Sequence, residues 1–272
     1  MEYLYLALFQ GLTEFLPVSS SGHLVFYQKI FGFQEPLLCF DIILHLATAL
    51  SVIVFLKNDL KKILSETFSA LKQIIDGKNF LTVWQEHAMF RLGGFVCIAI
   101  LPAIFVGLLF SDIIEGMFGS LRLVGLTFLI TGTILFLTQF ARQGNRDDFN
   151  MKDALLIGLA QAIAIVPGIS RSGSTIACGM FRGLDKNLAA RFSFILAVPT
   201  ILAAGIYKLM HGIGEINISI LVLCSSFFIA FLSGYVSLVF LSKMIAKAKF
   251  HYFAYYCWLM GGISIFLTIF YY

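Results

Sequence analysis

The sequence predicts an all-α integral membrane protein, with six spanning helices and two re-entrant helical hairpins in an inverted-topology repeat. Of its 272 residues, 59% are hydrophobic and 12% are charged, whereas soluble domains carry roughly 25% charged residues. Several apolar stretches reach the roughly 20 residues that cross a bilayer. Two others are broken by Pro, Ser and Gly. No Pro-rich or charged linker separates folded units, so we expect a single membrane domain over residues 1–272.

Continuous apolar stretches predict the spanning helices. They cover Phe40 to Leu56, Ala88 to Phe110, Leu121 to Phe140, Leu188 to Lys208, Ile216 to Leu241 and Tyr252 to Tyr271. The connection from about Lys57 to His87 mixes Lys and Glu with Leu and Ile. This mixture predicts an amphipathic helix at the membrane interface.

The remaining apolar segments, residues 2–30 and 153–181, are each interrupted near the middle, by Pro17 and by Pro167-Gly168. Each half is too short to cross a bilayer. Proline removes a backbone donor, and irregular backbone at membrane depth is tolerated only inside protein or beside a water-filled cavity. Each segment therefore predicts a hairpin of two half-helices that enters and leaves by the same face.

The distribution of positive charge predicts the orientation. With this topology most of the 19 Lys and Arg residues fall on one side of the membrane. The other side receives Lys29, Arg122 and Lys208, and Arg171 lies at a hairpin bend. By the positive-inside rule the first side is cytoplasmic, so both termini lie outside. The basic residues are scattered at segment ends and form no patch, which excludes a nucleic-acid partner.

The two hairpins belong to an internal repeat. A shift of 151 to 152 residues lays Gln10 on Gln161 and Ser19–Gly22 on Ser170–Gly173. An odd number of spans separates the hairpins, so the second half, about 153–272, runs upside down relative to the first, about 1–140. Inverted repeats in transporters place their site at the repeat interface near the bilayer midplane. We therefore expect the two bends to meet there.

Gln10 and Glu14 lie four residues apart on a half-helix and share a face that leads to Pro17. A carboxylate inside a membrane is costly and needs a partner. We expect Glu14 to pair with Arg171 or, together with Gln10, to hold a divalent cation, Mg²⁺ or Ca²⁺, which prefer oxygen ligands. A packing carboxylate without chemistry is the alternative.

Small polar residues at both bends are candidates for anion binding. They are Ser19, Ser20, Ser21 and Gly22 in the first hairpin, and Ser170, Ser172, Gly173 and Thr175 in the second. Helix N-termini bind phosphate through backbone N–H groups, and the Arg171 guanidinium matches phosphate oxygens in a bidentate way. Helix capping alone is the alternative role of such residues.

His23 follows the first bend and is a candidate general base, general acid or nucleophile, with a structural histidine as the alternative. Asp41 and His45, four apart in the next span, predict a buried hydrogen bond between helices. The sequence has no GxxxxGK[ST], HExxH or GxSxG motif, so nucleotide hydrolysis, zinc proteolysis and the serine-hydrolase elbow lack support.

Over its whole length the chain resembles the bacterial undecaprenyl-diphosphate phosphatases of the bacitracin-resistance type. One family motif matches Gln10 to His23, and the other, PGxSRSxxT, matches Pro167 to Thr175. The resemblance implies hydrolysis of undecaprenyl diphosphate to the monophosphate, which regenerates the lipid carrier for peptidoglycan and confers bacitracin resistance. It also implies a divalent metal and a site on the outer side of the bacterial cytoplasmic (inner) membrane.

The resemblance further implies that Glu14, Ser20, His23 and Arg171 form the catalytic set, with the other bend residues holding phosphate. Ser20 attacking with His23 as base is the first mechanism, and direct attack by His23 is the second. The chain departs from many relatives at Gln10, where they have Glu, and at Cys257, where they have Arg. A transporter or flippase of polyprenyl phosphate is the alternative function, and a homodimer is an open assembly state.

Overall fold

The computed structural model describes residues 1–33, 37–141, 144, 146–210 and 218–270, and these residues form helices and turns without a β-strand. In chain order the elements are α1 (Glu2–Phe15), α2 (Ser20–Ile30), α3 (Leu38–Phe55), α4 (Lys57–Ile75), α5 (Phe80–Glu86), α6 (Ala88–Leu109), α7 (Ser111–Met117), α8 (Leu121–Leu137), η1 (Thr138–Phe140), α9 (Met151–Ile163), α10 (Arg171–Phe181), α11 (Lys186–Met210), α12 (Ile220–Ala246), η2 (Phe250–Tyr252) and α13 (Phe253–Phe270).

The predicted spans are confirmed. Within the described residues, five helical segments are long and apolar enough to cross a membrane, namely α6, α8 with η1, α11, α12, and η2 with α13. Helix α3 supplies the sixth, and it is joined to α4 by a 78° bend. The predicted start of a span at Ile216 and the predicted end at Tyr271 lie outside the described residues. The predicted connection at Lys57 to His87 forms α4 and α5.

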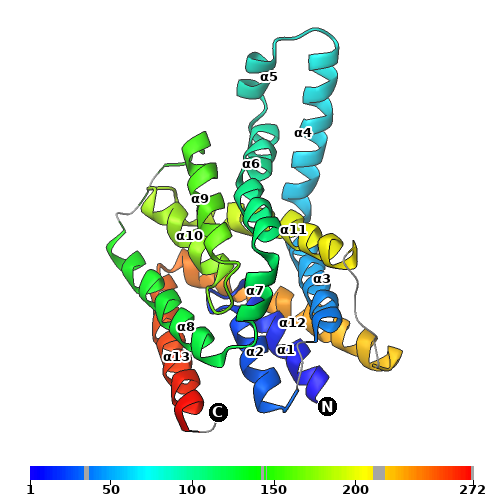
Figure 1. Cartoon of the computed structure of the whole chain (residues 1–272). Coiled ribbons are helices and arrows are strands. Elements are labelled where there is room, and N and C mark those ends of the chain that lie inside the picture. The colour runs from blue at the N-terminus through cyan, green and yellow to red at the C-terminus, as the bar shows by residue number, and fades with distance from the viewer. Residues whose placement is uncertain (34–36, 142–143, 145, 211–217, 271–272) are drawn as a thin grey trace.

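Both predicted hairpins are present. Helices α1 and α2 have 14 and 11 residues, and α9 and α10 have 13 and 11, so each is shorter than the roughly 20 residues that span a bilayer. The breaks between them, at residues 16–19 and 164–170, contain the expected prolines. In Figure 1 the α9–α10 hairpin lies above the α1–α2 hairpin.

The helix contacts follow the inverted repeat. Helix α1 packs along α12 of the second half, and its counterpart α9 packs along α6 of the first half. The counterparts α8 and α13 pack against each other, as do α3 and α11, and Figure 1 shows α8 beside α13. When the two halves are interchanged, the pair α1–α12 becomes the pair α9–α6, and the pairs α8–α13 and α3–α11 are unchanged. Each hairpin is therefore supported by a spanning helix of the opposite half.

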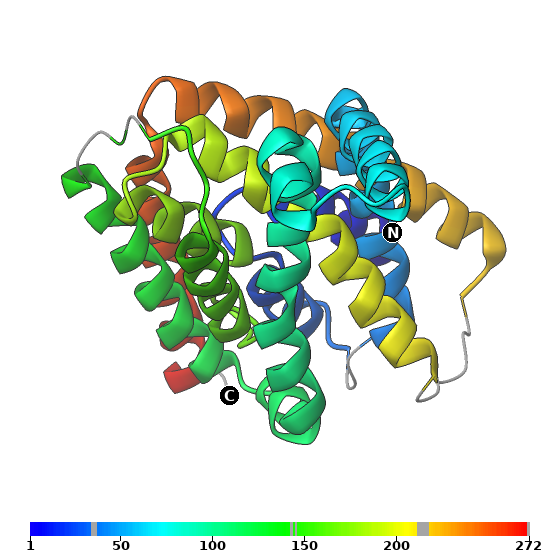
Figure 2. The ribbon, with the colours of Figure 1, turned by 90° about the horizontal axis from the view of Figure 1, so that it is seen from above.

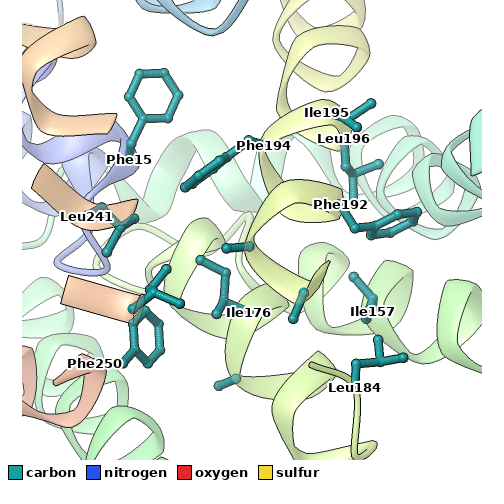
Figure 3. Packing of buried hydrophobic residues seen from close by; sticks show 14 of the residues in the cluster. Phe15, Ile157, Ile176, Leu184, Phe192, Phe194, Ile195, Leu196, Leu241 and Phe250 are labelled. Carbon is teal, nitrogen blue, oxygen red and sulfur yellow. The ribbon is translucent and has the colours of Figure 1, made fainter. Parts of the chain in front are cut away.

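A buried apolar cluster joins the two halves beneath the bends (Figure 3). Phe15 at the end of α1 lies in it with Phe194 of α11, and their ring centroids are 6.4 Å apart in an edge-to-face arrangement. Ile176 of α10 and Leu241 of α12 belong to the same cluster. Lipid tails are as apolar as these side chains, so the hydrophobic effect does not hold the helices together here. The cluster stabilises the fold through close van der Waals packing. The cluster holds the inner ends of the hairpins at fixed positions.

Candidate active site

The two bends touch at a pair of glycines. A Cβ added to Gly22 would lie 2.9 Å from Gly168 Cα. Gly168 has a φ of +89°, which L side chains rarely adopt, and a Cβ there would lie 1.9 Å from Thr127 Oγ1. Thr127 of α8 donates a hydrogen bond to Pro167 O at 2.7 Å, and Thr131 donates one to Gly168 O at 2.9 Å. Glycine is therefore required for the closest approach of the two hairpins.

Each bend ends in a serine cap, and the two caps make the same side-chain hydrogen bond, with the backbone N–H three residues on. Ser19 Oγ accepts a hydrogen bond from Gly22 N at 3.3 Å, and Ser170 Oγ accepts one from Gly173 N at 3.0 Å. These bonds satisfy backbone donors in the first turns of α2 and α10. Ser19 holds a positive φ of 65° in a non-glycine residue, and such strain is concentrated at functional sites.

Glu14 is the centre of the polar contacts between the bends. Its side chain is 4% exposed, and its Oε1 accepts a hydrogen bond from an Arg171 amino group at 2.6 Å. Its Oε2 accepts from Ser20 Oγ at 2.6 Å and from Gln10 Nε2 at 2.8 Å, and lies 3.6 Å from His45 Nε2. The expected pair of Glu14 with Arg171 is therefore formed. Two hydrogen-bond donors and one guanidinium therefore offset the cost of burying this carboxylate.

A cavity of about 270 Å³ lies beside these residues. The polar and charged side chains among those that line it are Glu14, Ser19, Ser20, Ser21, Gln28, Asp41, His45, Gln161, Ser170, Arg171, Thr200 and Lys208. The rest of its wall is largely apolar. A cavity lined by hydroxyls, cations and apolar side chains suits an anionic group attached to a hydrocarbon chain.

His23 points away from Glu14 and Ser20. Its Nδ1 lies 2.8 Å from the Ser19 carbonyl oxygen, its Nε2 lies 2.7 Å from the Tyr256 hydroxyl, and its ring stacks on Tyr256. It is 1% exposed, and it does not contribute to the cavity wall. Since both ring nitrogens have other partners, the expected pairing of Ser20 with a His23 base is not formed in this structure.

Two other members of the expected phosphate-binding set also face away from the cavity. Ser172 Oγ donates to Leu16 O at 3.2 Å, which ties the second hairpin to the bend of the first. The Thr175 hydroxyl lies 2.7 Å from that of Ser193. Gly22 and Gly173 serve the caps and the close approach, as described above. The structure brings Glu14, Ser19, Ser20, Ser21, Ser170 and Arg171 to the cavity.

The sequence analysis did not assign Asp41 and His45 to the site, yet both line the cavity. The His45 Nδ1 donates a hydrogen bond to the Asp41 carbonyl oxygen at 2.7 Å, and the His45 Nε2 lies 3.6 Å from Glu14 Oε2. The Asp41 carboxylate accepts hydrogen bonds from Gln28 Nε2 at 3.1 and 3.2 Å. Their spacing of four residues within an apolar span was the sequence feature that could have indicated a place in the site.

Two buried glutamines at equivalent positions of the repeat have incomplete hydrogen bonding. Among the described residues, Gln10 Oε1 and Gln161 Nε2 are buried and lack hydrogen-bond partners. The other amide atom of each side chain is bonded: Gln10 Nε2 donates to Glu14, and Gln161 Oε1 accepts from Thr200. No cluster of three or more His, Cys, Asp or Glu side chains suited to a metal ion occurs in the described part of the chain.

Fold and site together define a multi-pass helical membrane protein whose inverted repeat surrounds a cavity lined by Glu14, serine hydroxyls and Arg171. The chain belongs to the family of the bacitracin resistance protein BacA, whose family model matches residues 3–263. It is 39% identical over 266 residues to an undecaprenyl-diphosphatase of Desulforapulum autotrophicum, covering 96% of this chain and 95% of that protein. It is 40% identical over 267 residues to one of Methanobrevibacter smithii, covering 97% and 95%.

Proposed function

We propose that this protein hydrolyses undecaprenyl diphosphate to undecaprenyl phosphate and orthophosphate, and thereby recycles the lipid carrier of envelope polymers and supports bacitracin resistance. The observation that carries this proposal is the contact of Glu14 with both Ser20 and Arg171 at the wall of a cavity. An acid, a hydroxyl and a guanidinium together supply a proton acceptor, a nucleophile and a phosphate ligand. Relatives that carry the undecaprenyl-diphosphatase name over nearly the full length support the same substrate.

In the proposed reaction Ser20 Oγ attacks the terminal phosphorus while its proton passes to Glu14 Oε2, which already accepts its hydrogen bond. The bond from this phosphorus to the bridging oxygen breaks, and its electron pair stays on that oxygen of the departing undecaprenyl phosphate. Water then attacks the phosphoserine, releases orthophosphate and restores the Ser20 hydroxyl. Glu14 replaces His23 as the base in this proposal because of the observed contacts.

Arg171 neutralises the charge that develops on the transferred phosphoryl group. One of its amino groups is bound to Glu14, and the guanidinium carries further donors that can reach phosphate oxygens at the same time. Donors fixed where charge develops contribute about 2.7–4 kcal/mol each to lowering a reaction barrier. Ser19, Ser21 and Ser170 line the same end of the cavity and provide neutral donors.

The donor set fits a divalent cation that is held mainly by the substrate. Gln10 Oε1 has no hydrogen-bond partner among the described residues, and Glu14 supplies a carboxylate beside it. Mg²⁺ commonly binds one or two carboxylates together with substrate phosphates. When bound, such a cation withdraws charge from phosphate oxygens. Gln10 and Glu14 are the proposed protein ligands, and Mg²⁺ and Ca²⁺ are the proposed metals.

The proposed location is the cytoplasmic (inner) membrane, with the cavity reached from the outer side and both termini outside. The excess of Lys and Arg on the opposite side supports this orientation. The transporter alternative shares the inverted repeat. We prefer hydrolysis because the contact of Ser20 with Glu14 joins a nucleophile to a proton acceptor, which transport alone does not need.

Purified protein in detergent tests the proposal, with undecaprenyl diphosphate as substrate. We expect release of one orthophosphate per lipid, with undecaprenyl phosphate as the second product, and expect Glu14→Gln to abolish it. Absence of phosphate release by the folded wild-type protein, with Mg²⁺ or Ca²⁺ present, would overturn the proposal. Movement of labelled lipid across proteoliposomes by the inactive variant would instead support the transporter.

A further inference from the structure

Helix α4 leaves the bundle at the end of α3. The two helices meet at Leu56 with a 78° bend, and α4 continues for 19 residues. In Figure 1, α4 and α5 extend beyond the other helices, and in Figure 2, α4 is seen nearly along its axis while α8 and α11 lie across the view. Helix α4 therefore runs steeply across the direction of the spans, as a helix that lies in a membrane interface does.

The acidic residues within α4 are both engaged with the bundle. Asp59 Oδ2 accepts a hydrogen bond from Arg191 Nε at 2.8 Å, and Glu66 Oε2 accepts one from Met89 N at 2.9 Å. Both contacts are made to other helices, α11 and α6. The outward surface of α4 is consequently left with Lys and apolar side chains, and its local charge is positive.

Four residues at helical spacing along the outward surface change from charged to apolar. Lys57, Lys61, Leu64 and Phe68 are separated by four, three and four positions, so they lie on one face of α4. Leu64 and Phe68 are 70% and 75% exposed, which leaves these large apolar side chains without protein cover. The cations occupy the end near the α3–α4 bend, and the apolar residues follow.

A shallow groove of about 580 Å³ runs along this face and onto α3. Its lining residues are Ile53, Lys57, Leu60, Lys61, Leu64, Ser65 and Phe68. Two ammonium groups and a hydroxyl thus stand beside a continuous apolar floor. Clustered lysines attract anionic lipid head groups, and apolar side chains bury acyl chains.

We propose that this α3–α4 groove binds one anionic glycerophospholipid of the bilayer. Lys57, Lys61 and Ser65 contact its phosphate, and an acyl chain lies over Ile53, Leu64 and Phe68. The charge complementarity and the placement of the groove at the end of a span favour a lipid, because head groups and acyl chains meet at this level. The lipid site is separate from the catalytic cavity and does not depend on the proposed reaction.

Native mass spectrometry of the full chain in detergent tests the site, with phosphatidylglycerol and phosphatidylcholine of identical acyl chains as probes. The double variant K57Q/K61Q is compared with K62Q/K72Q, which removes two exposed lysines of α4 that do not line the groove. We expect the wild type to retain phosphatidylglycerol preferentially. K57Q/K61Q should weaken that binding roughly tenfold or more, whereas K62Q/K72Q should change it less than threefold.

A second variant separates the acyl-chain contact from the charge. Phe68→Ser should weaken both lipids by a similar factor, because it removes apolar floor without changing charge. The proposal would be overturned if the wild type and K57Q/K61Q preferred phosphatidylglycerol over phosphatidylcholine to the same degree. It would also be overturned if K62Q/K72Q lost as much phosphatidylglycerol binding as K57Q/K61Q. A dimer mass that is lost in Phe68→Ser, without any lipid-bound species, would show that a second copy of the chain covers this face and would also overturn it.

Discussion

Glu14 and Arg171 form a 2.6 Å ion pair across 157 positions of sequence, and this pair joins the two hairpins at the cavity. Their side chains are 4% and 16% exposed. Each charge is thus the main reason why the other is tolerated at this depth. The pair also keeps the guanidinium at the position where a phosphate would bind, so one contact serves both folding and the proposed chemistry.

Removal of either charge alone should destabilise the protein. Arg171→Gln should lower the free energy of unfolding by about 3–5 kcal/mol because it leaves Glu14 buried without its cation. The double variant Glu14→Gln/Arg171→Gln should recover much of that stability but none of the phosphate release. Thermal unfolding in detergent and a phosphate assay measure the two effects. If the stability loss of the double variant equalled the sum of the two single losses, the energetic coupling of Glu14 and Arg171 would be contradicted.

The Ser20 hydroxyl should be the reacting group of the first hairpin. Ser20→Ala should lower phosphate release by at least roughly 10³-fold, because neither the nucleophile nor its bond to Glu14 remains. Ser21→Ala is the matched control, since its hydroxyl lines the same cavity and, among the described residues, contacts the Ser19 hydroxyl at 3.3 Å and not Glu14. We expect a loss below tenfold there. Acid-quenched labelling with substrate radioactive in its terminal phosphate should trap phosphoserine in the wild type.

His23 should act by holding the first bend in place. Its contacts to Ser19 O and the Tyr256 hydroxyl predict that Tyr256→Phe and His23→Gln each lower the free energy of unfolding by about 1–3 kcal/mol. The rate of phosphate release should fall, and the acid limb of its pH profile should keep its midpoint. Loss of that acid limb in His23→Gln, with an unchanged melting temperature, would support His23 as the base instead.

The close contact of the second bend with α8 makes Gly168 intolerant of any side chain. Gly168→Ala places a methyl group 1.9 Å from Thr127 Oγ1 at a φ of +89°, and should prevent folding or cost several kcal/mol of stability. Gly183→Ala is the control, because its φ is +79° but nothing lies within 4 Å of the added Cβ. It should cost only the backbone strain, about 1–2 kcal/mol. Similar melting temperatures for the two variants would refute the contact.

Removal of the metal should affect phosphate release but not the stability of the folded protein. If a cation is shared between Gln10, Glu14 and the substrate phosphates, EDTA should abolish phosphate release while leaving the melting temperature unchanged, because Arg171 already balances Glu14 in the free protein. Added Mg²⁺ or Ca²⁺ should restore activity. Gln10→Glu should strengthen the response to the metal by adding an anionic ligand, and an identical metal requirement in that variant would argue against Gln10 as a ligand.

The helices and hairpins could be predicted because their causes are local. Apolar length separates spans from half-helices, and Pro17 and Pro167 lie at the predicted interruptions. The pairing of Glu14 with Arg171 could also be predicted, since a buried carboxylate needs a cation and the repeat brings the bends together. These predictions needed only composition, spacing and an offset between two motifs.

The direction of individual side chains could not be predicted in the same way. The sequence places His23 three residues after Ser20, but it does not show that Tyr256 binds its Nε2 from another helix. Likewise, the spacing of Asp41 and His45 shows that they share one helix face, but it does not show that this face meets the cavity. These outcomes depend on packing between α2, α3 and α13, which is set by contacts across more than 200 positions in the case of His23 and Tyr256.

The exchange of partners between the halves also has a consequence for synthesis. Helix α1 emerges first from the ribosome, but its packing partner α12 begins only at Ile220. The first hairpin therefore waits for most of the chain before it reaches its final neighbours, and it must be sheltered from lipid with its polar bend in the meantime. Assembly of Glu14 with Arg171 is thus a late event in biogenesis, and truncated chains should be captured by membrane quality-control proteases.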